Sequence, residues 1–324
     1  MTALLSRCLN VAMSNLRKRR QDTVLPLLIA LIAIITGVIE PHFWAVDNLL
    51  NLARQMVPLL IISVGQAFVL IGGGLDLSLA AVMSLCGVSG VLVMNRFGIP
   101  AGIGVMIVAG VAIGLISGCI IGFFRATPLV VTLGMLSVAQ ACALILSNGT
   151  PIYEVPASYA QFVGFDSLMG VPWSVWIAIG TALGGGFLLS RTVFGRYVYA
   201  IGSNSKAATK SGVNVPFFTM LVYGLSGLTA AIGAIILTAW VGSAQPIAAP
   251  DITLQSLAAV VLGGVALTGG RGSMSQVIYG VTMLSMMSNV MNMIGVSAYY
   301  QTLVIGVVII LAVVLDRLRR KEQE

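Results

Sequence analysis

Residues 49–71 read LLNLARQMVPLLIISVGQAFVLI, and the segment GGGLDLS at residues 72–78 ends this apolar run. An α-helix needs about 20 mostly apolar residues to cross a hydrocarbon core about 30 Å thick, so the run is long enough to span a membrane. Similar runs recur along the chain. We expect about ten spans, at residues 24–39, 49–71, 77–94, 101–124, 129–146, 172–189, 217–241, 254–267, 274–293 and 298–314. The sequence therefore predicts an all-α polytopic membrane protein, in which runs of glycine break some helices or make them re-entrant.

The composition supports a membrane protein without a soluble domain. Of the 324 residues, 58% are hydrophobic and only 8% are charged, whereas soluble domains carry about 25% charged residues. The longest polar stretches, 148–171 and 191–216, are too short to fold as separate domains. We expect a cytoplasmic N-terminal segment at 1–23, one transmembrane domain at 24–316 that includes the cytoplasmic loop 191–216, and a cytoplasmic tail at 317–324.

The basic residues predict the orientation of the chain in the membrane. With ten spans and a cytoplasmic N-terminus, all of the 17 Lys and Arg residues except Arg54 and Arg96 fall in cytoplasmic segments. Positive charge is enriched in the cytoplasmic loops of membrane proteins. We therefore expect both termini in the cytoplasm of a multi-pass inner-membrane protein. The net charge of +7 reflects this topology, and nucleic acid is not an expected partner.

The sequence lacks the residues that an enzyme or a metal site would need. His42 is the only histidine, and neither metal-ligand spacings nor paired carboxylates occur within one apolar region. A phosphate loop of the form G-x-x-x-x-G-K-[ST] is also absent from the sequence. We expect no catalytic residue, no metal and no cofactor, and we expect the energy for any transport to come from another protein.

The segment after the first quoted helix can be interpreted in two ways. Its three glycines end the helix, and Asp76 could cap the next helix by accepting backbone N–H groups at the membrane surface. Alternatively, an acidic residue at a helix break marks a transport pathway, because burying it in a membrane is costly. Gly73, Gly74, Asp76 and Ser78 are therefore candidate residues of a translocation path.

The polar stretch 191–216 is the longest segment expected on the cytoplasmic side. Residues 203–211 favour a short helix that ends at Gly212, and Ala207 with Ala208 would give it an apolar face. A solvated basic loop would need neither feature, whereas a docking surface for a cytoplasmic partner would use both.

Glycine patterns predict close helix contacts and a second helix break. Gly114, Gly118 and Gly122 are spaced by four residues, as in helices whose backbones approach closely in lipid. The glycines of residues 263–273 break a helix, which indicates a re-entrant turn rather than a phosphate-binding nest. Residues 261–267 also resemble residues 69–75, and interrupted helices in two related halves often meet at a substrate path.

These motifs together resemble the permease subunit of bacterial sugar ABC importers of the ribose type. The resemblance covers nearly the whole chain and is strongest at residues 73–78, 195–215, 243–246, 258–264, 269–272 and 299–301. It implies a permease homodimer in membrane lipid, two cytoplasmic ABC ATPase subunits and a periplasmic sugar-binding protein. It also implies that the 195–215 segment receives the ATPase, through Gly195, Arg196, Tyr199, Gly202, Asn204, Ala207, Ala208 and Gly212. The candidate translocation path comprises Gly73, Gly74, Asp76, Ser78, Gln245, Gly263 and Gly264.

The predicted function is therefore the permease subunit of an ATP-driven importer for a ribose-like pentose or hexose. Two departures from the family pattern bear on the sugar: Leu79 and Ala80 follow the Asp-Leu-Ser motif, and the acidic Asp251 precedes Gln255 instead of lying nearer residues 258–261.

One alternative function is a secondary transporter or facilitator, which would need buried ionisable residues such as Asp76 or Arg54. Another is an ABC permease for a nucleoside or a branched-chain amino acid.

Overall fold

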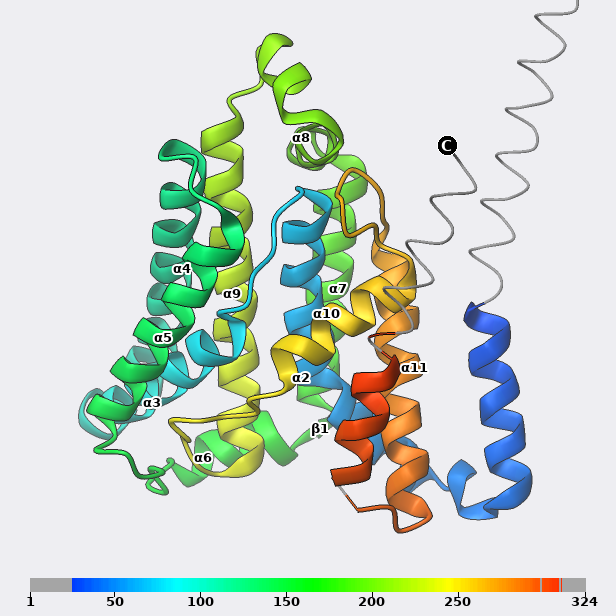
Figure 1. The fold of residues 1–324 in the computed structure, drawn as a ribbon. Coiled ribbons are helices and arrows are strands. Elements are labelled where there is room, and N and C mark those ends of the chain that lie inside the picture. Colours follow the sequence, from blue (N-terminus) through cyan, green and yellow to red (C-terminus); the bar gives the residue numbers. More distant parts are fainter. Residues whose placement is uncertain (1–24, 298, 309, 311–324) are drawn as a thin grey trace, which may run out of the picture.

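The computed structural model describes residues 25–297, 299–308 and 310, and Figure 1 shows them as a bundle of helices. The segments expected at 1–23 and 317–324, and the end of the span expected at 298–314, lie outside the described residues. The labelled elements are η1 (Pro41–Trp44), α2 (Val46–Ile71), α3 (Leu79–Phe97), α4 (Ile99–Phe123), α5 (Pro128–Leu146), α6 (Ala157–Tyr159), η2 (Ala160–Phe165), β1 (Ser167–Leu168), β2 (Val171–Pro172), α7 (Trp173–Arg191), α8 (Val193–Lys210), α9 (Val215–Val241), α10 (Ile252–Gly263) and α11 (Met274–Met293). Two further helices, Leu25–Ile39 and Tyr299–Val308, lie toward the ends of the chain.

Six of the described helices are long and apolar enough to cross a bilayer. They are α2, α3, α4, α5, α7 and α9, and each corresponds to a span expected from the sequence. The chain is therefore a polytopic helical membrane protein, as predicted.

The other expected spans have a different form in the described residues. The span expected at 254–267 is the 12-residue helix α10, which stops at Gly263 because Gly264 is left-handed with φ 108°. The expected span at 24–39 is the short helix Leu25–Ile39. Helix α11 has 20 residues but is less apolar, with Gln276, Ser285 and Asn289 among them. Within the described residues, length and composition thus identify six spans.

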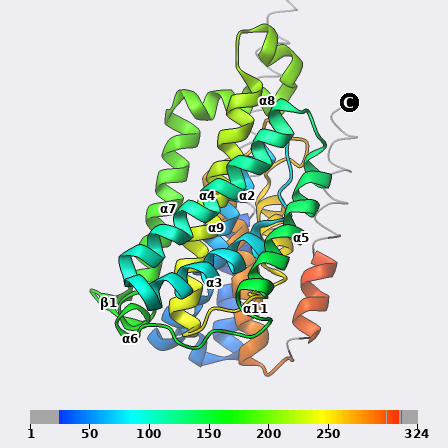
Figure 2. The ribbon, with the colours of Figure 1, turned by 90° about the vertical axis from the view of Figure 1, so that its left-hand side faces the viewer.

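The two ends of the bundle differ in structure. Helix α8 lies across one end, roughly perpendicular to α7, in both Figure 1 and Figure 2. The β1–β2 hairpin, with α6 and η2, lies at the opposite end. We call these the α8 end and the hairpin end. Helix α2 is the central element and is mostly buried, whereas α4, α5 and α7 leave most of their surface uncovered.

Helices α4 and α9 form the most extensive helix contact of the bundle, and glycines make it close. A Cβ at Gly114 would overlap the Tyr223 carbonyl oxygen, and one at Gly118 would lie 2.7 Å from Met220 Cα. A Cβ at Gly122 would lie 2.6 Å from the Pro216 carbonyl oxygen. The spaced glycines therefore bring two helix backbones together, as the sequence predicted.

The chain turns back into the bundle after α2. Residues 72–78 leave α2 at the α8 end and run toward the hairpin end without helical structure, so that α3 begins at Leu79 well inside the bundle (Figures 1 and 2). Asp76 lies in this segment and is only 3% exposed. Asp76 accepts the Ser78 backbone N–H directly before α3, but its burial contradicts the expected position at the membrane surface. Ser78 is the residue that precedes α3, and it makes no side-chain capping bond.

The segment expected as a loop at 191–216 is mostly helical. Helix α8 begins at Val193, ten residues before the expected short helix, and its backbone is interrupted only at Asn204 (φ −162°, ψ 97°). The loop interpretation failed because polar and glycine residues outnumber apolar ones here. The half-buried and buried side chains of Phe194, Val198 and Ile201, three or four residues apart, are nevertheless a helical pattern.

Candidate functional site

Helix α8 starts with a tight turn after α7. The Thr192 side chain caps the new helix by accepting a hydrogen bond from the Gly195 backbone N–H at 3.3 Å. Gly195 is buried in this turn, and a Cβ at this position would overlap the Leu189 carbonyl oxygen. A glycine is therefore needed here to let α8 leave α7 and lie across the bundle.

Asn204 divides α8 into two arms. Its Oδ1 accepts a hydrogen bond from the Ala207 backbone N–H at 3.0 Å, so it caps the second arm at the point where the first one stops. The second arm ends at Gly212, which is left-handed with φ 84°. A small apolar cluster of Ile201, Ala208 and Val213 packs the two arms together.

The first arm of α8 rests directly on the end of α2 and on the loop that follows α10. A Cβ at Gly202 would overlap the Ile71 carbonyl oxygen and would lie 2.6 Å from the Gly270 nitrogen. The same two atoms are joined to each other, because the Gly270 N–H donates to the Ile71 carbonyl at 2.8 Å. A Cβ at Gly269 would lie 2.8 Å from Gly73 Cα. Glycines thus allow backbone contact between α8 and the two helix breaks, which are the segments that follow α2 and α10.

Tyr199 adds a side-chain bond to this contact. Its hydroxyl group donates to the Gly272 carbonyl oxygen at 2.6 Å. Burial raises the pKa of Tyr199 above its ordinary value, so the hydroxyl keeps its proton, and hence its hydrogen bond, at neutral pH. A displacement of α8 would therefore pull on the loop after α10.

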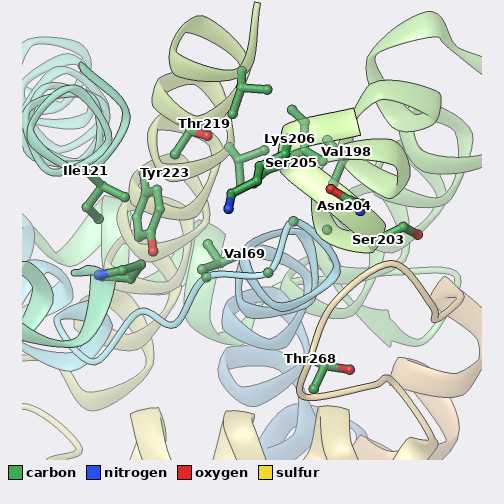
Figure 3. A pocket seen from close by; sticks show the side chains of 18 residues that line it. Val69, Ile121, Val198, Ser203, Asn204, Ser205, Lys206, Thr219, Tyr223 and Thr268 are labelled. Carbon is green, nitrogen blue, oxygen red and sulfur yellow. The ribbon is translucent and has the colours of Figure 1, made fainter. Parts of the chain in front are cut away.

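A cavity of about 510 Å³ lies beside this contact, between α8, α9 and the break after α2. The Lys206 side chain extends into it, and Tyr223 and Thr219 of α9 face it from the other side (Figure 3). Its polar lining also includes Ser203, Asn204, Ser205 and Thr268. Among the described residues, none of those that line the cavity is acidic. Hydroxyl, amide and ammonium groups of this kind can hydrogen-bond a small polar solute, and the volume is typical of small-molecule sites.

The carboxyl group of Asp76 lies farther into the bundle than this cavity. Its Oδ1 accepts hydrogen bonds from the Ser78 hydroxyl at 2.7 Å and from the Ser78 backbone N–H at 3.0 Å. Its Oδ2 accepts a hydrogen bond from the Ser226 hydroxyl of α9 at 2.7 Å. Tyr223, one turn earlier on α9, donates to the Leu75 carbonyl at 3.2 Å. Two α9 hydroxyls therefore fasten the non-helical segment 72–78 to α9.

The residues predicted to receive an ATPase have different roles in the structure. Arg196, Asn204, Ala207 and Gly212 are exposed on α8 or at its end. Gly195, Tyr199 and Gly202 instead face the bundle, and Ala208 is 4% exposed, inside the apolar cluster. The apolar face expected from Ala207 and Ala208 is therefore split, because only Ala207 points outward.

The residues predicted for the translocation path do not come together in one place. Gly73 and Gly74 line the 510 Å³ cavity, and Asp76 with Ser78 lies deeper on α9. Gln245 lines a separate, smaller cavity nearer the hairpin end. A Cβ at Gly263 would overlap the Gln276 carbonyl oxygen, so this glycine permits the close packing of α10 on α11, and Gly264 lies beside the same residue.

The sequence did not predict which side chains of other elements line the cavity or bind Asp76. Ser226, Tyr223 and Thr219 belong to an apolar span, and only their three- to four-residue spacing on one helix face could have indicated a polar lining. Lys206 falls in the short helix predicted at 203–211, and nothing in the sequence shows that its side chain enters a cavity. Within the described residues, no cluster of His, Cys, Asp and Glu is suited to a metal ion.

Comparison with known families identifies the class of protein. The family model of the branched-chain amino acid transport system / permease component matches residues 48–313. The chain belongs to this permease family. It is a multi-pass protein of the bacterial inner membrane, consistent with its six long apolar helices.

Similar proteins of known assignment are permeases of sugar importers. The chain is 35% identical over 293 residues to the ribose import permease protein RbsC of Escherichia coli K12, covering 89% of this chain and 91% of that protein. It is 36% identical over 298 residues to the ribose import permease protein RbsC of Bacillus subtilis, covering 89% and 90%. It is 31% identical over 298 residues to the D-allose transport system permease protein AlsC of Escherichia coli K12, covering 91% of each. No solved structure matches the chain.

Proposed function

We propose that this chain is the membrane-spanning permease subunit of an ATP-driven ABC importer for a monosaccharide. The family supports a permease, and relatives that align along about nine-tenths of the chain are named for ribose and D-allose. The cavity lined by hydroxyl, amide and ammonium groups suits a solute with many hydroxyl groups. The chain forms the path, and a separate ATPase supplies the energy.

The observation that carries the proposal is the position of α8. It lies outside the bundle, yet Gly202 touches the backbone of α2 and of the loop after α10. An ATPase that moved α8 would move both helix breaks with it, because glycine contacts leave no side chains to absorb the displacement. The exposed residues Arg196, Asn204 and Ala207 would contact the ATPase, and Lys210 lies beside them.

The charge distribution supports the orientation of the chain. Arg125, Arg191, Arg196, Lys210 and Arg271 belong to segments at the α8 end. Positive charge favours the cytoplasmic side, so the α8 end faces the cytoplasm, where the ATPase resides. The hairpin end then faces the periplasm and receives the sugar-binding protein.

The complete transporter in this proposal contains two copies of the chain in membrane lipid, two ATPase subunits and one binding protein. Each copy has a single transmembrane domain over 24–316 with about ten membrane segments, of which the shorter helices are re-entrant or partial. Both termini lie in the cytoplasm, and the chain has no ATPase site of its own.

A purification experiment tests the partners, and an uptake experiment tests the cargo. The chain, produced together with the ATPase and the binding protein of the proposed importer, should purify with the ATPase through a tag on the permease. Membrane vesicles from these cells should take up D-ribose or D-allose, or L-arabinose, the sugar for which a further relative is named. Leucine uptake without sugar uptake would instead favour an amino-acid permease, in line with the description of the family model.

A further inference from the structure

The 510 Å³ cavity beside α8 contains a positive charge that nothing in the described chain neutralises. Lys206 reaches into it from α8 (Figure 3), and its ammonium group makes no hydrogen bond or ion pair with the described residues. Residues 167–250, which include α7, α8 and α9, contain neither Asp nor Glu. Asp76 is already bonded to Ser78 and Ser226 and does not line the cavity. An ammonium group without a counter-charge attracts an anion.

A hydroxyl group on the opposite wall of the cavity also lacks a partner. A Thr side chain within a helix can bond the backbone carbonyl four residues earlier, and Thr181 and Thr238 of this chain both do so at 2.8 Å. Thr219 of α9 makes no hydrogen bond within the described residues, and it faces the cavity across from Lys206 (Figure 3). Its hydroxyl group is therefore available to a ligand in the cavity.

The remaining polar lining suits a ligand with several hydroxyl groups. Ser203, Ser205 and Thr268 supply hydroxyl groups, and Asn204 supplies an amide. Each hydroxyl can donate one hydrogen bond and accept others. Lysine is a common ligand of phosphate groups, to which it makes charge-assisted hydrogen bonds. A sugar that carries a phosphate group would therefore pair both kinds of group, the ammonium and the hydroxyls.

The walls of the cavity belong to parts of the chain that must separate if α8 is displaced from the bundle. Helix α8 supplies Val198 and residues 201–206, whereas the bundle supplies residues 72–74 and the first turns of α9. A ligand held by Lys206 on one side and by Thr219 on the other would tie α8 to α9. A ligand that binds one of two arrangements shifts the equilibrium toward that arrangement. Occupation of the cavity would therefore oppose the displacement of α8.

We propose that this cavity is a regulatory site for a phosphorylated monosaccharide on the cytoplasmic side, and that its occupation slows import. The inference rests on the proposed sugar-import function and adds a regulatory ligand to it. Phosphoryl transfer from ATP to the imported sugar would supply this ligand. In that reaction a sugar hydroxyl oxygen bonds to the terminal phosphorus of ATP, the bond from this phosphorus to the bridging oxygen breaks, and ADP and a proton leave. The reaction that consumes the imported sugar thus produces the molecule that restrains its import.

The test uses the complete transporter in phosphatidylcholine proteoliposomes, with D-ribose 5-phosphate and ATP on the side of the membrane that carries the ATPase. Uptake of labelled D-ribose should fall as the concentration of this ester rises. For a single site, uptake falls about 11-fold at ten times the half-inhibiting concentration. D-Ribose or inorganic phosphate on the same side should inhibit more weakly, since each offers only one of the two kinds of group. ATP hydrolysis by the isolated ATPase should not respond to the ester.

Variants of the lining locate the site. Lys206→Met removes the ammonium group and should raise the half-inhibiting concentration at least about tenfold, as expected for a lost hydrogen bond to a charged group. Thr219→Val removes one hydroxyl group and should raise it about 2- to 10-fold. Lys210→Met makes the same change as Lys206→Met on the same arm of α8 but outside the lining, and should leave it unchanged. The uptake of each variant without the ester is its own reference.

Equilibrium dialysis measures binding without transport. The detergent-solubilised complete transporter is dialysed against labelled D-ribose 5-phosphate. The wild type and Lys210→Met should bind the ester equally, and Lys206→Met should bind it at least about tenfold more weakly. Lys206 is exposed, so its replacement should leave the melting temperature unchanged and a loss of binding cannot be ascribed to unfolding.

Four results would overturn this inference. Equal binding and inhibition in the wild type and Lys206→Met would place the ester outside this cavity. Equal inhibition by D-ribose would show that the phosphate group is not recognised, and inhibition of the isolated ATPase would show that the ester acts there. Vesicles with added phosphatidic acid test a lipid headgroup as the source of the phosphate, and inhibition through Lys206 by this lipid but not by the ester would contradict the proposal. If the wild type takes up no sugar with ATP, the proposed function fails, while dialysis still shows whether the cavity binds the ester.

Discussion

Replacing Gly202 by alanine tests how α8 is connected to the membrane helices. The new Cβ would overlap the Ile71 carbonyl oxygen and lie 2.6 Å from the Gly270 nitrogen. Both obstacles are backbone atoms, so no side chain can rotate away from the added methyl group. The first arm of α8 must therefore move off the ends of α2 and the loop after α10.

The magnitude of this effect follows from three opposing terms. Overpacking costs about 1–3 kcal/mol, and loss of the Gly270 N–H to Ile71 carbonyl bond costs about 0.5–1.5 kcal/mol. Alanine in place of glycine favours the helix itself by about 1 kcal/mol. The docked position of α8 should thus lose about 0.5–3.5 kcal/mol, which shifts the docking equilibrium about 2- to 400-fold.

The assay measures ATP hydrolysis and sugar uptake on the same proteoliposomes. We expect Gly202→Ala to hydrolyse ATP but to move at least about twofold less sugar per ATP, since the ATPase can drive α8 without moving the helix breaks. Gly184→Ala is the matched control, because it makes the same change on α7 with nothing within 4 Å of the new Cβ. A folded Gly202→Ala transporter with the wild-type amount of sugar moved per ATP would refute the coupling role of this contact.

Three further changes follow from the same structure. Gly114→Leu should lower the stability of the α4–α9 contact by about 1–3 kcal/mol or more in chemical denaturation, whereas Gly104→Leu on the same helix, with nothing within 4 Å, should not; equal stability of the two would contradict the close contact. Ala207→Arg should reduce copurification of the ATPase and leave the melting temperature unchanged because the residue is exposed, whereas buried Ala208→Arg should lower that temperature. For Tyr199, burial raises the pKa above 10.0, so the stability from its protonated form is complete below pH 10 and is lost as pH rises further. Tyr199→Phe should therefore show a smaller loss of stability than the wild type in alkaline titrations above pH 10, and an identical loss would contradict the bond.

The spans were predictable because hydropathy and helix spacing are local properties. The run at 49–71 became α2, with the same end at Ile71, and the glycines of 101–124 formed the predicted close contact on α9. The length of α8 was missed, because a helix lying on a surface buries only one narrow stripe and its other residues resemble a loop.

The buried contacts were not predictable from one sequence. Asp76 was recognised as unusual, but its depth depends on Ser226, 150 residues away along the chain, and no local pattern pairs them. The sequence therefore indicated where helices break. The structure was needed to identify the distant side chains that contact the non-helical segments.

The energy source of uptake tests the central claim most directly. Proteoliposomes with this chain alone, and others with the chain, its ATPase and its binding protein, are compared for uptake of labelled D-ribose, D-allose and L-arabinose. We expect uptake only in the complete set, and only with ATP on the side of the membrane that carries the ATPase. An imposed proton or sodium gradient should have no effect on this uptake. Gradient-driven uptake by the chain alone, without ATP, would contradict the assignment as an ABC importer permease.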